Sequence, residues 1–269
     1  MSCFLDLPPE LACEIVGKWL CLKDVVRLDS AFCHSAKRNV LHESVFQSPL
    51  CIVAIPAPSY LLMPAMFTWV SMKCIRLSTL HVRNGAGFDN YEDYLKRFGD
   101  TVHSVAFSYC RGHSTLRLAV VARYCPNLCV LAAIYCGLSP CVDILKSCAW
   151  LRSIDITSDQ MSRHLVHRNI HATHHLHISS IKLHCLRDEE VILGMCDPLC
   201  VQRLRLANMT NIDWHTFVNL RSFGFEYDSL IHDANLLVQI CTLCPWIVNL
   251  KVYRVFQLSD EMVVPALQV

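Results

Sequence analysis

A six-residue pattern of apolar positions, apolar-x-x-apolar-x-apolar, recurs along most of the chain. Its eight copies begin at Leu77, Val102, Leu128, Leu151, Ile178, Val201, Leu220 and Ile247, a spacing of 19 to 27 residues. Alternating apolar positions are typical of a strand with one buried face, and one such strand cannot cover that face alone. We therefore expect a stack of repeating units that share one continuous core.

Helical apolar spacing lies between these predicted strands. We expect helices over 89–98, 115–125, 138–148, 188–196 and 232–244, with a weaker candidate over 159–169. A strand followed by a helix in each unit predicts an α/β fold, with a curved parallel sheet inside and helices outside. We assign this array to residues 74–269. A further helical pattern at 258–264 indicates either a capping helix or an array that continues beyond this sequence.

The N-terminal part of the chain follows a different pattern. Apolar residues keep a helical spacing over 11–32. Pro9 and Glu10 favour a helix start, because proline suits a first turn and a carboxylate stabilises the positive end of a helix. We predict a small helical module at 1–45, followed by a connector and N-terminal cap at 46–73.

Composition narrows the possible functions. The chain has 269 residues, of which 53% are hydrophobic and 17% charged, so a large core can form and disorder is excluded. The formal net charge of +1 provides no general attraction for nucleic acid or acidic membranes. The odd number of cysteines, 17, and the absence of a signal-peptide pattern favour the cytoplasm or nucleus. Most of the cysteines are then expected to be buried apolar side chains.

One stretch has the length and apolar character of a membrane span. Residues 44–72 contain no charged residue. Pro49, Pro56, Pro58 and Pro64 interrupt this stretch, and prolines break the continuous helix that a span requires. We therefore expect a buried connector that packs against the first repeat, and no membrane partner.

The N-terminal module resembles an F-box. Leu7-Pro8-Pro9-Glu10-Leu11 matches the opening of that family, and Ile15, the pair Trp19-Leu20 and the pair Asp24-Val25 continue it. The resemblance implies that the module docks on the adaptor subunit of SCF-type ubiquitin ligases. The adaptor-binding residues that it implies are Leu7, Pro8, Glu10, Leu11, Ile15, Trp19, Leu20, Val25 and Leu28.

The repeating part resembles the cysteine-containing leucine-rich repeats that often follow an F-box. In such repeats a Cys-Pro-x-Leu joint connects helix and strand, and a cysteine or asparagine closes the strand. Residues 125–128 and Cys136 match this pattern, and the joint recurs at 148–151 and 244–247. The resemblance implies a leucine-rich repeat solenoid that binds another protein.

Two groups of potential metal ligands have simpler structural explanations. Cys241 and Cys244 have the spacing of half a zinc site, but a second pair is missing and the repeat pattern already places Cys244 in the core. The histidine cluster comprises His164, His167, His171, His174, His175 and His177. It lacks the H-E-x-x-H pattern of metalloproteases, and we expect a solvent-facing connector there, with metal binding left open. No signature of an enzyme is present either, so we assign no catalytic residue, no metal ligand and no cofactor.

The strand positions that alternate with the buried ones define a candidate target-binding surface. Its apolar part comprises Val130, Ala132 and Ile134. Its basic part comprises Lys182, His184, Arg203, Arg205 and Lys251, with Tyr253 beside them. An apolar anchor beside a basic zone suits a protein segment with one hydrophobic side chain and acidic or phosphorylated groups. A generic solvated face is the alternative.

These features predict a non-enzymatic subunit of a ubiquitin ligase that recruits substrates in the cytoplasm or nucleus. Its partners are the SCF adaptor subunit and a protein target, without nucleic acid. The alternative is a leucine-rich repeat interaction scaffold, in which the N-terminal helices only cap the array and no adaptor binds.

Overall fold

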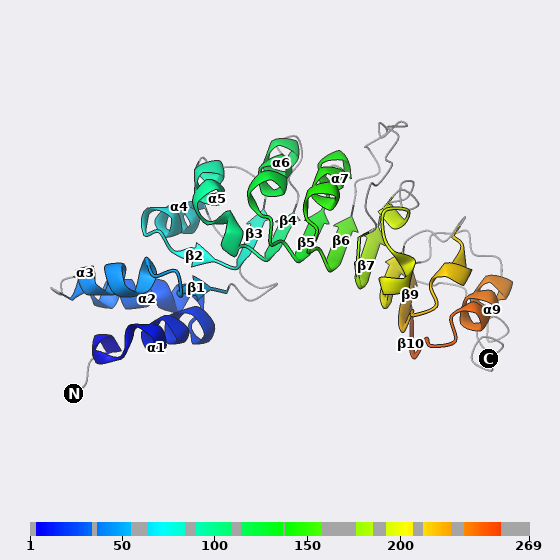
Figure 1. Ribbon diagram of the computed structural model, residues 1–269, viewed down its shortest axis with the longest axis horizontal. Helices are drawn as coiled ribbons and strands as arrows, with labels where there is room; N and C mark the ends of the chain where they lie inside the picture. Colours follow the sequence, from blue (N-terminus) through cyan, green and yellow to red (C-terminus); the bar gives the residue numbers. More distant parts are fainter. Residues whose placement is uncertain are drawn as a thin grey trace. The chain divides into compact units, whose positions relative to one another are not determined.

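The structure is a computed structural model of the chain. It describes residues 4–33, 37–54, 64–83, 90–108, 114–136, 138–157, 176–184, 192–206, 212–226 and 234–253. The chain divides into two compact units, Met1–Leu128 and Cys129–Val269. Both units are of the α/β class, with parallel strands and accompanying helices (Figure 1).

A helical module forms the beginning of the first unit. Its elements are η1 (Phe4–Asp6), α1 (Pro9–Glu14), the π-helical turn η2 (Ile15–Trp19), α2 (Leu22–Ala31), the short helix α3 (Arg38–Val40) and the π-helical turn η3 (Leu41–Phe46). Pro9 occupies the first turn of α1, where its missing N–H group needs no partner. The fully buried side chains of Val16, Leu41 and Phe46 form the centre of the module.

A pair of short strands follows the module. Strand β1 (Ile52–Val53) pairs in parallel with β2 (Arg76–Leu77). Gly17 in η2 lies against β1, since a Cβ atom at Gly17 would stand 2.8 Å from the carbonyl oxygen of Ile52. Sequence analysis did not predict β1, because two residues are too short to show a strand period.

The remainder of the first unit contains α4 (Pro64–Met72), β3 (Thr79–Arg83), α5 (Tyr91–Phe98), the 3-10 turn η4 (Gly99–Thr101), β4 (Ser104–Ser108) and α6 (Ser114–Tyr124). Strands β3 and β4 pair in parallel, and α5 and α6 lie on one side of them (Figure 1). The buried hydroxyl of Tyr94 donates a hydrogen bond to the carbonyl of Ile75 and accepts one from the N–H of Leu77, both at 3.0 Å. Helix α5 is thereby fixed to the start of the strands.

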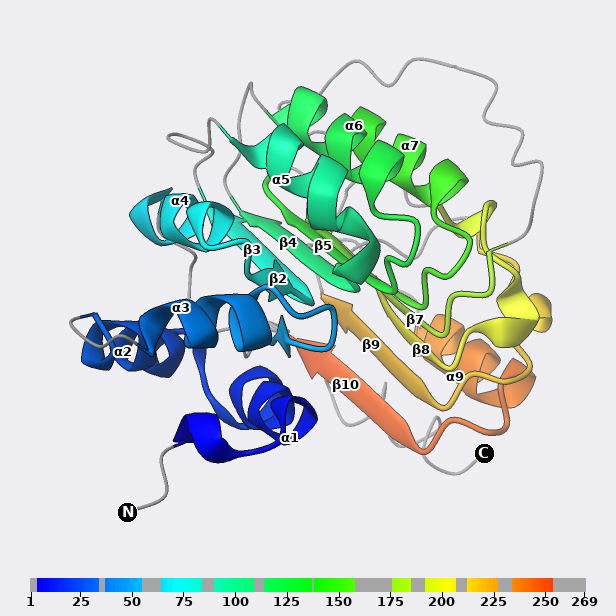
Figure 2. The ribbon, with the colours of Figure 1, turned by 60° about the vertical axis from the view of Figure 1, so that its left-hand side comes forward.

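The second unit consists of β5 (Val130–Ile134), α7 (Leu138–Ser147), β6 (Ser153–Thr157), β7 (Ser180–His184), η5 (Pro198–Cys200), β8 (Arg203–Leu206), η6 (Trp214–Thr216), β9 (Ser222–Glu226), α9 (Ala234–Leu243) and β10 (Asn249–Tyr253). Its six strands pair in parallel and in sequence order (Figure 2). The apolar positions of the copies that begin at Leu151, Ile178, Val201 and Leu220 are buried in the core, for example Leu151, Ile154 and Ile156. In the last copy, Ile247 and Leu250 are half-buried.

The same pair of hydrogen bonds precedes each strand of the second unit after β5. The N–H groups of Arg152 and Ser153 both donate to the carbonyl of Cys129, at 2.8 and 3.0 Å. The pair recurs from Ser179 and Ser180 to Arg152, from Gln202 and Arg203 to Ser179, from Arg221 and Ser222 to Gln202, and from Val248 and Asn249 to Arg221. Corresponding residues of the different copies therefore occupy equivalent positions in the structure.

All eight predicted strands are confirmed, and each begins two residues after the first apolar position of its copy. Helices α5, α6, α7 and α9 confirm four predicted helices. The predicted helix at 188–196 is described only from 192 onward, and those at 159–169 and 258–264 lie outside the described residues. Within the described ranges, every helix is too short or too polar to cross a lipid bilayer.

Candidate protein-interaction surfaces

A row of charged side chains crosses the sheet of the second unit on the face opposite its buried residues. Strand register places Asp155 beside Lys182, Lys182 beside Arg205, Arg205 beside Gly224, and Gly224 beside Lys251. Neighbouring strands lie about 4.8 Å apart, so these positions form one continuous line. Arg203 is exposed two residues before Arg205. The line runs from one carboxylate to several cations, with a gap at the glycine.

The basic part of this face is smaller than the sequence indicated. Nζ of Lys182 donates to Oδ2 of Asp155 at 2.7 Å, so the nearest carboxylate offsets the charge of this lysine. Oδ1 of Asp155 is buried without a hydrogen-bond partner among the described residues. The other cations of this face are Arg203 and Lys251, which are exposed, and Arg205, which is half-buried.

The other predicted target-binding residues lie on the same strands. Val130 is 38% exposed at the start of β5, and Ala132 and Ile134 are half-buried further along it. They form the predicted apolar strip, and Ala132 stands directly beside Asp155. His184 is half-buried at the end of β7, and Tyr253 ends β10 with a side chain outside the described part.

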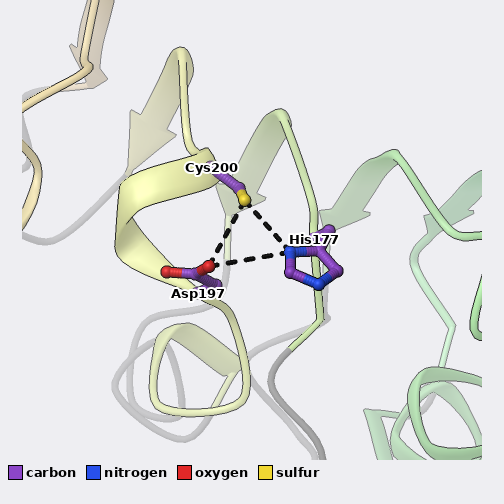
Figure 3. A group of neighbouring side chains, drawn as sticks. All are labelled: His177, Asp197 and Cys200. Atoms are coloured by element: carbon purple, nitrogen blue, oxygen red, sulfur yellow. Dashed lines mark hydrogen bonds and ion pairs between the residues drawn. The ribbon is translucent and has the colours of Figure 1, made fainter.

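One group of potential metal ligands is found within the described ranges, and it also belongs to the second unit. His177, Asp197 and Cys200 present donor atoms within 4.8 Å of one another (Figure 3). Nδ1 of His177 lies 3.1 Å from Sγ of Cys200 and 3.6 Å from Oδ2 of Asp197, and Sγ donates to Oδ2 at 3.3 Å. Burial, together with the hydrogen bond to Asp197 and its charge, raises the pKa of the Cys200 thiol, against an opposing effect of Arg152.

In the first unit, an apolar stripe is exposed on the helical module. Leu11, Ile15 and Trp19 follow one another at intervals of four along the continuous helix of α1 and η2. Leu11 is 44% exposed, Trp19 is 78% exposed, and Ile15 between them is half-buried. A module of this size cannot bury all of its large apolar side chains, and an exposed row of them marks a contact surface.

Most of the other predicted adaptor-binding residues are accessible. Pro8 and Glu10 are exposed, and Leu7, Leu20 and Leu28 are half-buried. Val25 is fully buried with Leu22 on the inner face of α2, which corrects its assignment to the contact surface. Helical spacing identified Val25 as apolar, but it could not decide which side of α2 faces the core.

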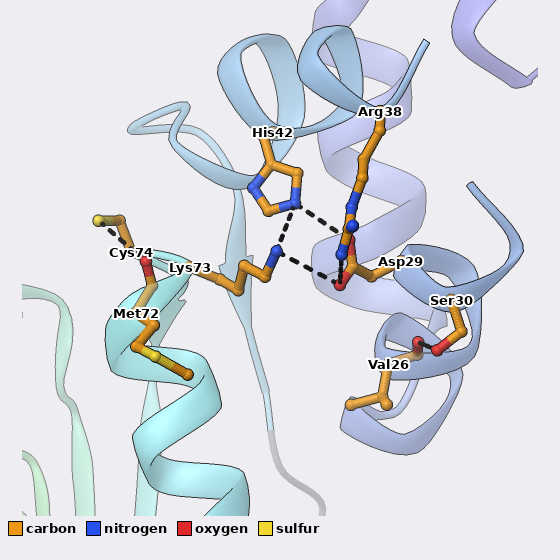
Figure 4. Close-up of polar contacts among 8 residues, drawn as sticks. All are labelled: Val26, Asp29, Ser30, Arg38, His42, Met72, Lys73 and Cys74. Atoms are coloured by element: carbon orange, nitrogen blue, oxygen red, sulfur yellow. Dashed lines mark hydrogen bonds and ion pairs between the residues drawn. The ribbon is translucent and has the colours of Figure 1, made fainter. Parts of the chain in front are cut away.

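A network around one buried carboxylate connects the module to α4. Asp29, only 4% exposed, accepts hydrogen bonds from Arg38 at 3.3 and 3.1 Å (Figure 4). Nε2 of His42 lies 3.0 Å from Oδ1, and Nζ of Lys73 lies 3.6 Å from Oδ2. Burial raises the pKa of Asp29, but the hydrogen bonds from Arg38 and His42 and the charges of Lys73 and Arg38 outweigh burial, so the pKa is lowered. The carboxylate ties α2, α3, η3 and the end of α4 together.

The sequence-based explanations for the cysteines and histidines have different outcomes. Cys244 is buried, and its thiol donates to the carbonyl of Trp214 at 3.7 Å, as expected for a core residue. Cys241 is half-buried on α9. Of the histidine cluster, the structure describes His177. The other five histidines of the cluster lie outside the described part of the chain.

The groupings around Asp29 and around His177 were missed by sequence analysis. Asp29 did carry a signal, because it falls on the same helical face as Leu22 and Val25. Comparison with known proteins adds no assignment to these sites. No protein-family model matches the chain, and no curated protein sequence matches it.

Proposed function

We propose that this chain is the substrate-recruiting subunit of an SCF-type ubiquitin ligase. In this proposal, residues 1–45 are an F-box-like module that docks on the adaptor, and a leucine-rich repeat solenoid holds a protein target. The observation that carries the proposal is the exposed stripe of Leu11, Ile15 and Trp19, because it coincides with the residues that resemble the F-box motif.

The chemistry of the stripe suits a protein partner. Tryptophan is enriched among the residues that dominate the energy of protein interfaces, since it buries a large rigid surface. Trp19 is mostly exposed to water, and Leu11 is exposed to a smaller extent. Covering them removes apolar surface from water, which favours association.

The face of the second unit suits an acidic segment of a target. Arg203 and Lys251 are exposed on this face, and Arg205 lies on the same strand as Arg203. An anionic side chain or phosphate can form charge-assisted hydrogen bonds with such groups. The strip of Val130, Ala132 and Ile134 offers an adjacent place for one apolar side chain.

The mechanism that follows from this arrangement is proximity. The chain performs no bond-making step itself. Binding of the adaptor and the target by one chain raises the effective concentration of the target's lysines near the ubiquitin-carrying enzyme, as linkage of two binding sites does in general.

One observation favours the alternative of an interaction scaffold with an N-terminal cap. Strand β1 directly follows the module and pairs with β2, and Gly17 packs against the backbone of β1. These contacts are those of a cap that shields the first strand of an array. A cap explains them without an adaptor, but it leaves Leu11 and Trp19 without a role.

The test of the proposal is co-purification with the adaptor of the host's SCF ligases. We expect the wild-type chain to retain the adaptor and the double variant Leu11→Asp, Trp19→Asp to lose it, because two carboxylates would enter an apolar interface. Both positions are exposed, so the variant is expected to fold. The matched control is Val218→Asp, Val248→Asp, which alters two exposed apolar residues of the second unit.

Retention of the adaptor by the control but not by the module variant would support the proposal. If the wild-type chain retains no adaptor, the module is a cap and the scaffold alternative holds. Circular dichroism and thermal unfolding of all three proteins would exclude loss of folding as the cause.

A second experiment addresses the target face. In cells, the variant Arg203→Glu, Arg205→Glu is expected to keep the adaptor and to lose proteins that the wild-type chain enriches, because repulsion replaces attraction for an acidic segment. The control Lys146→Glu, Arg221→Glu makes the same change in net charge. Both positions are exposed, and neither belongs to the predicted adaptor-binding or target-binding residues. Quantitative mass spectrometry of the captured proteins measures the difference. An unchanged set of captured proteins would rule out this face as the target site.

A further inference from the structure

The geometry of His177, Asp197 and Cys200 is independent of the function proposed above. Their three donor atoms form a triangle with sides of 3.1, 3.3 and 3.6 Å. Zinc lies about 2.0–2.2 Å from nitrogen and oxygen ligands and about 2.3 Å from sulfur. At a tetrahedral angle these bond lengths separate the ligands by about 3.3 to 3.6 Å. One ion can therefore reach all three atoms with little movement of the side chains.

The backbone holds two of the ligands in place. Leu176, which precedes His177, receives the N–H of Asp197 at 2.9 Å and donates its own N–H to the carbonyl of Met195 at 3.0 Å. Oδ1 of Asp197 accepts the N–H of Leu199 at 3.0 Å, which leaves Oδ2 directed at the other two side chains. Partners of this kind fix the orientation of metal ligands in proteins.

His177 and Cys200 occupy a position at which other copies of the repeat have a different residue with a structural role. His177 and Cys200 each stand immediately before the first apolar position of a copy, where two other copies have asparagine. Nδ2 of Asn127 donates to the carbonyl of Asp100 at 2.8 Å, and Nδ2 of Asn219 donates to that of Leu199 at 2.7 Å. In those two copies, the asparagine bonds to the backbone of the preceding copy. At the same position, His177 and Cys200 contact each other instead, through an imidazole and a thiol.

A catalytic arrangement of these three residues does not fit. In a nucleophile–histidine–carboxylate triad, one ring nitrogen faces the nucleophile and the other faces the carboxylate. Here Nδ1 faces both Sγ and Oδ2. One nitrogen cannot accept a proton from the thiol and donate one to the carboxylate at the same time, whereas a cation binds the lone pairs of all three.

We propose that His177, Asp197 and Cys200 bind a divalent ion of the zinc class. Thiolate and imidazole ligands select zinc over calcium and magnesium, which prefer oxygen. The side chain of His177 is 68% exposed, so the site lies at the surface and water completes the fourth position. The ion displaces the thiol proton of Cys200, which is released to water, and neutralises the carboxylate of Asp197. It thereby joins the segments that precede β7 and β8.

The test measures the binding of Zn²⁺ and of Co²⁺, a spectroscopic probe, to the purified full chain under reducing conditions. We expect one site per chain with a cobalt–thiolate charge-transfer band. The variants His177→Ala, Cys200→Ser and Asp197→Asn should each weaken binding at that site by about 100-fold or more, since loss of an outer-shell partner alone costs about 10- to 100-fold. Asparagine at 197 keeps an acceptor for the N–H of Leu199, so this variant preserves the local fold.

The controls are His215→Ala, an exposed histidine of the next copy, and Cys241→Ser, in the Cys241-x-x-Cys244 pair. Both are expected to bind the ion like the wild-type chain. The proposal is overturned if the wild type binds no ion, if the three ligand variants bind as tightly as the wild type, or if Cys241→Ser abolishes the site instead.

Discussion

Replacement of Asp29 by asparagine is expected to lower the free energy of unfolding of the first unit by about 3 kcal/mol, the lower end of the cost of breaking a buried ion pair. The variant leaves Arg38, Lys73 and His42 around a neutral side chain that offers fewer acceptor sites. Arg38 is partly exposed, so water will reduce the cost below its maximum. Urea unfolding followed by circular dichroism measures the change.

The same carboxylate predicts a dependence on pH. Because the pKa of Asp29 is lowered in the folded state, its contribution is fully present above the pKa of the unfolded chain, about 3.9. The contribution is lost as the pH falls through the lower pKa of the folded state. The difference in stability between wild type and Asp29→Asn should therefore shrink as the pH falls below about 4.

Asp24→Asn is the matched control, because Asp24 lies on the same helix and pairs with Arg27 at the surface. Exposed pairs contribute about 0 to 1 kcal/mol. Equal losses for Asp24→Asn and Asp29→Asn, or a difference that grows on acidification, would contradict the role given to the buried network.

Replacement of Gly99 by alanine is expected to destabilise the first unit by about 3 kcal/mol, the upper end of the cost of overpacking. A Cβ atom at Gly99 would overlap the carbonyl oxygen of Tyr124 and stand 2.9 Å from its carbonyl carbon. These are backbone atoms at the end of α6, so they cannot rotate away as a side chain would. Relief requires η4 and α6 to move apart.

The control for Gly99→Ala is Asp100→Ala at the adjacent exposed position. Substitutions at such sites usually change stability by no more than about 0.5 kcal/mol. The same urea titration distinguishes the two variants. If Gly99→Ala lowers the free energy of unfolding by less than about 1 kcal/mol, η4 and α6 can move apart at little cost.

The repeating part of the fold was predictable because one signal occurs eight times. Each strand has the same alternation of apolar positions, and the structure begins every strand at the same place in its copy. The module was predictable as helical, but its inner and outer sides were not. Val25 and Trp19 are both apolar residues at helical spacing, and the structure places one inside and the other outside.

The polar sites follow from contacts between distant residues. Asp29 and Lys73 are 44 residues apart (73 − 29), and nothing in a local pattern pairs them. The metal ligands are a different case, since aligned copies place His177 and Cys200 at one position of two consecutive units. His177 also belongs to a run of histidines in the sequence, and this run is the more conspicuous of the two patterns.

Binding of the N-terminal module to the adaptor can be measured by titration calorimetry with the purified proteins. We expect one-to-one binding by the wild-type chain and at least about tenfold weaker binding by Trp19→Ala, as for a residue that dominates an interface. Trp150→Ala, which removes an exposed tryptophan of the second unit, should bind like the wild type. No binding by the wild type, or equal binding by wild type and Trp19→Ala, would contradict the account.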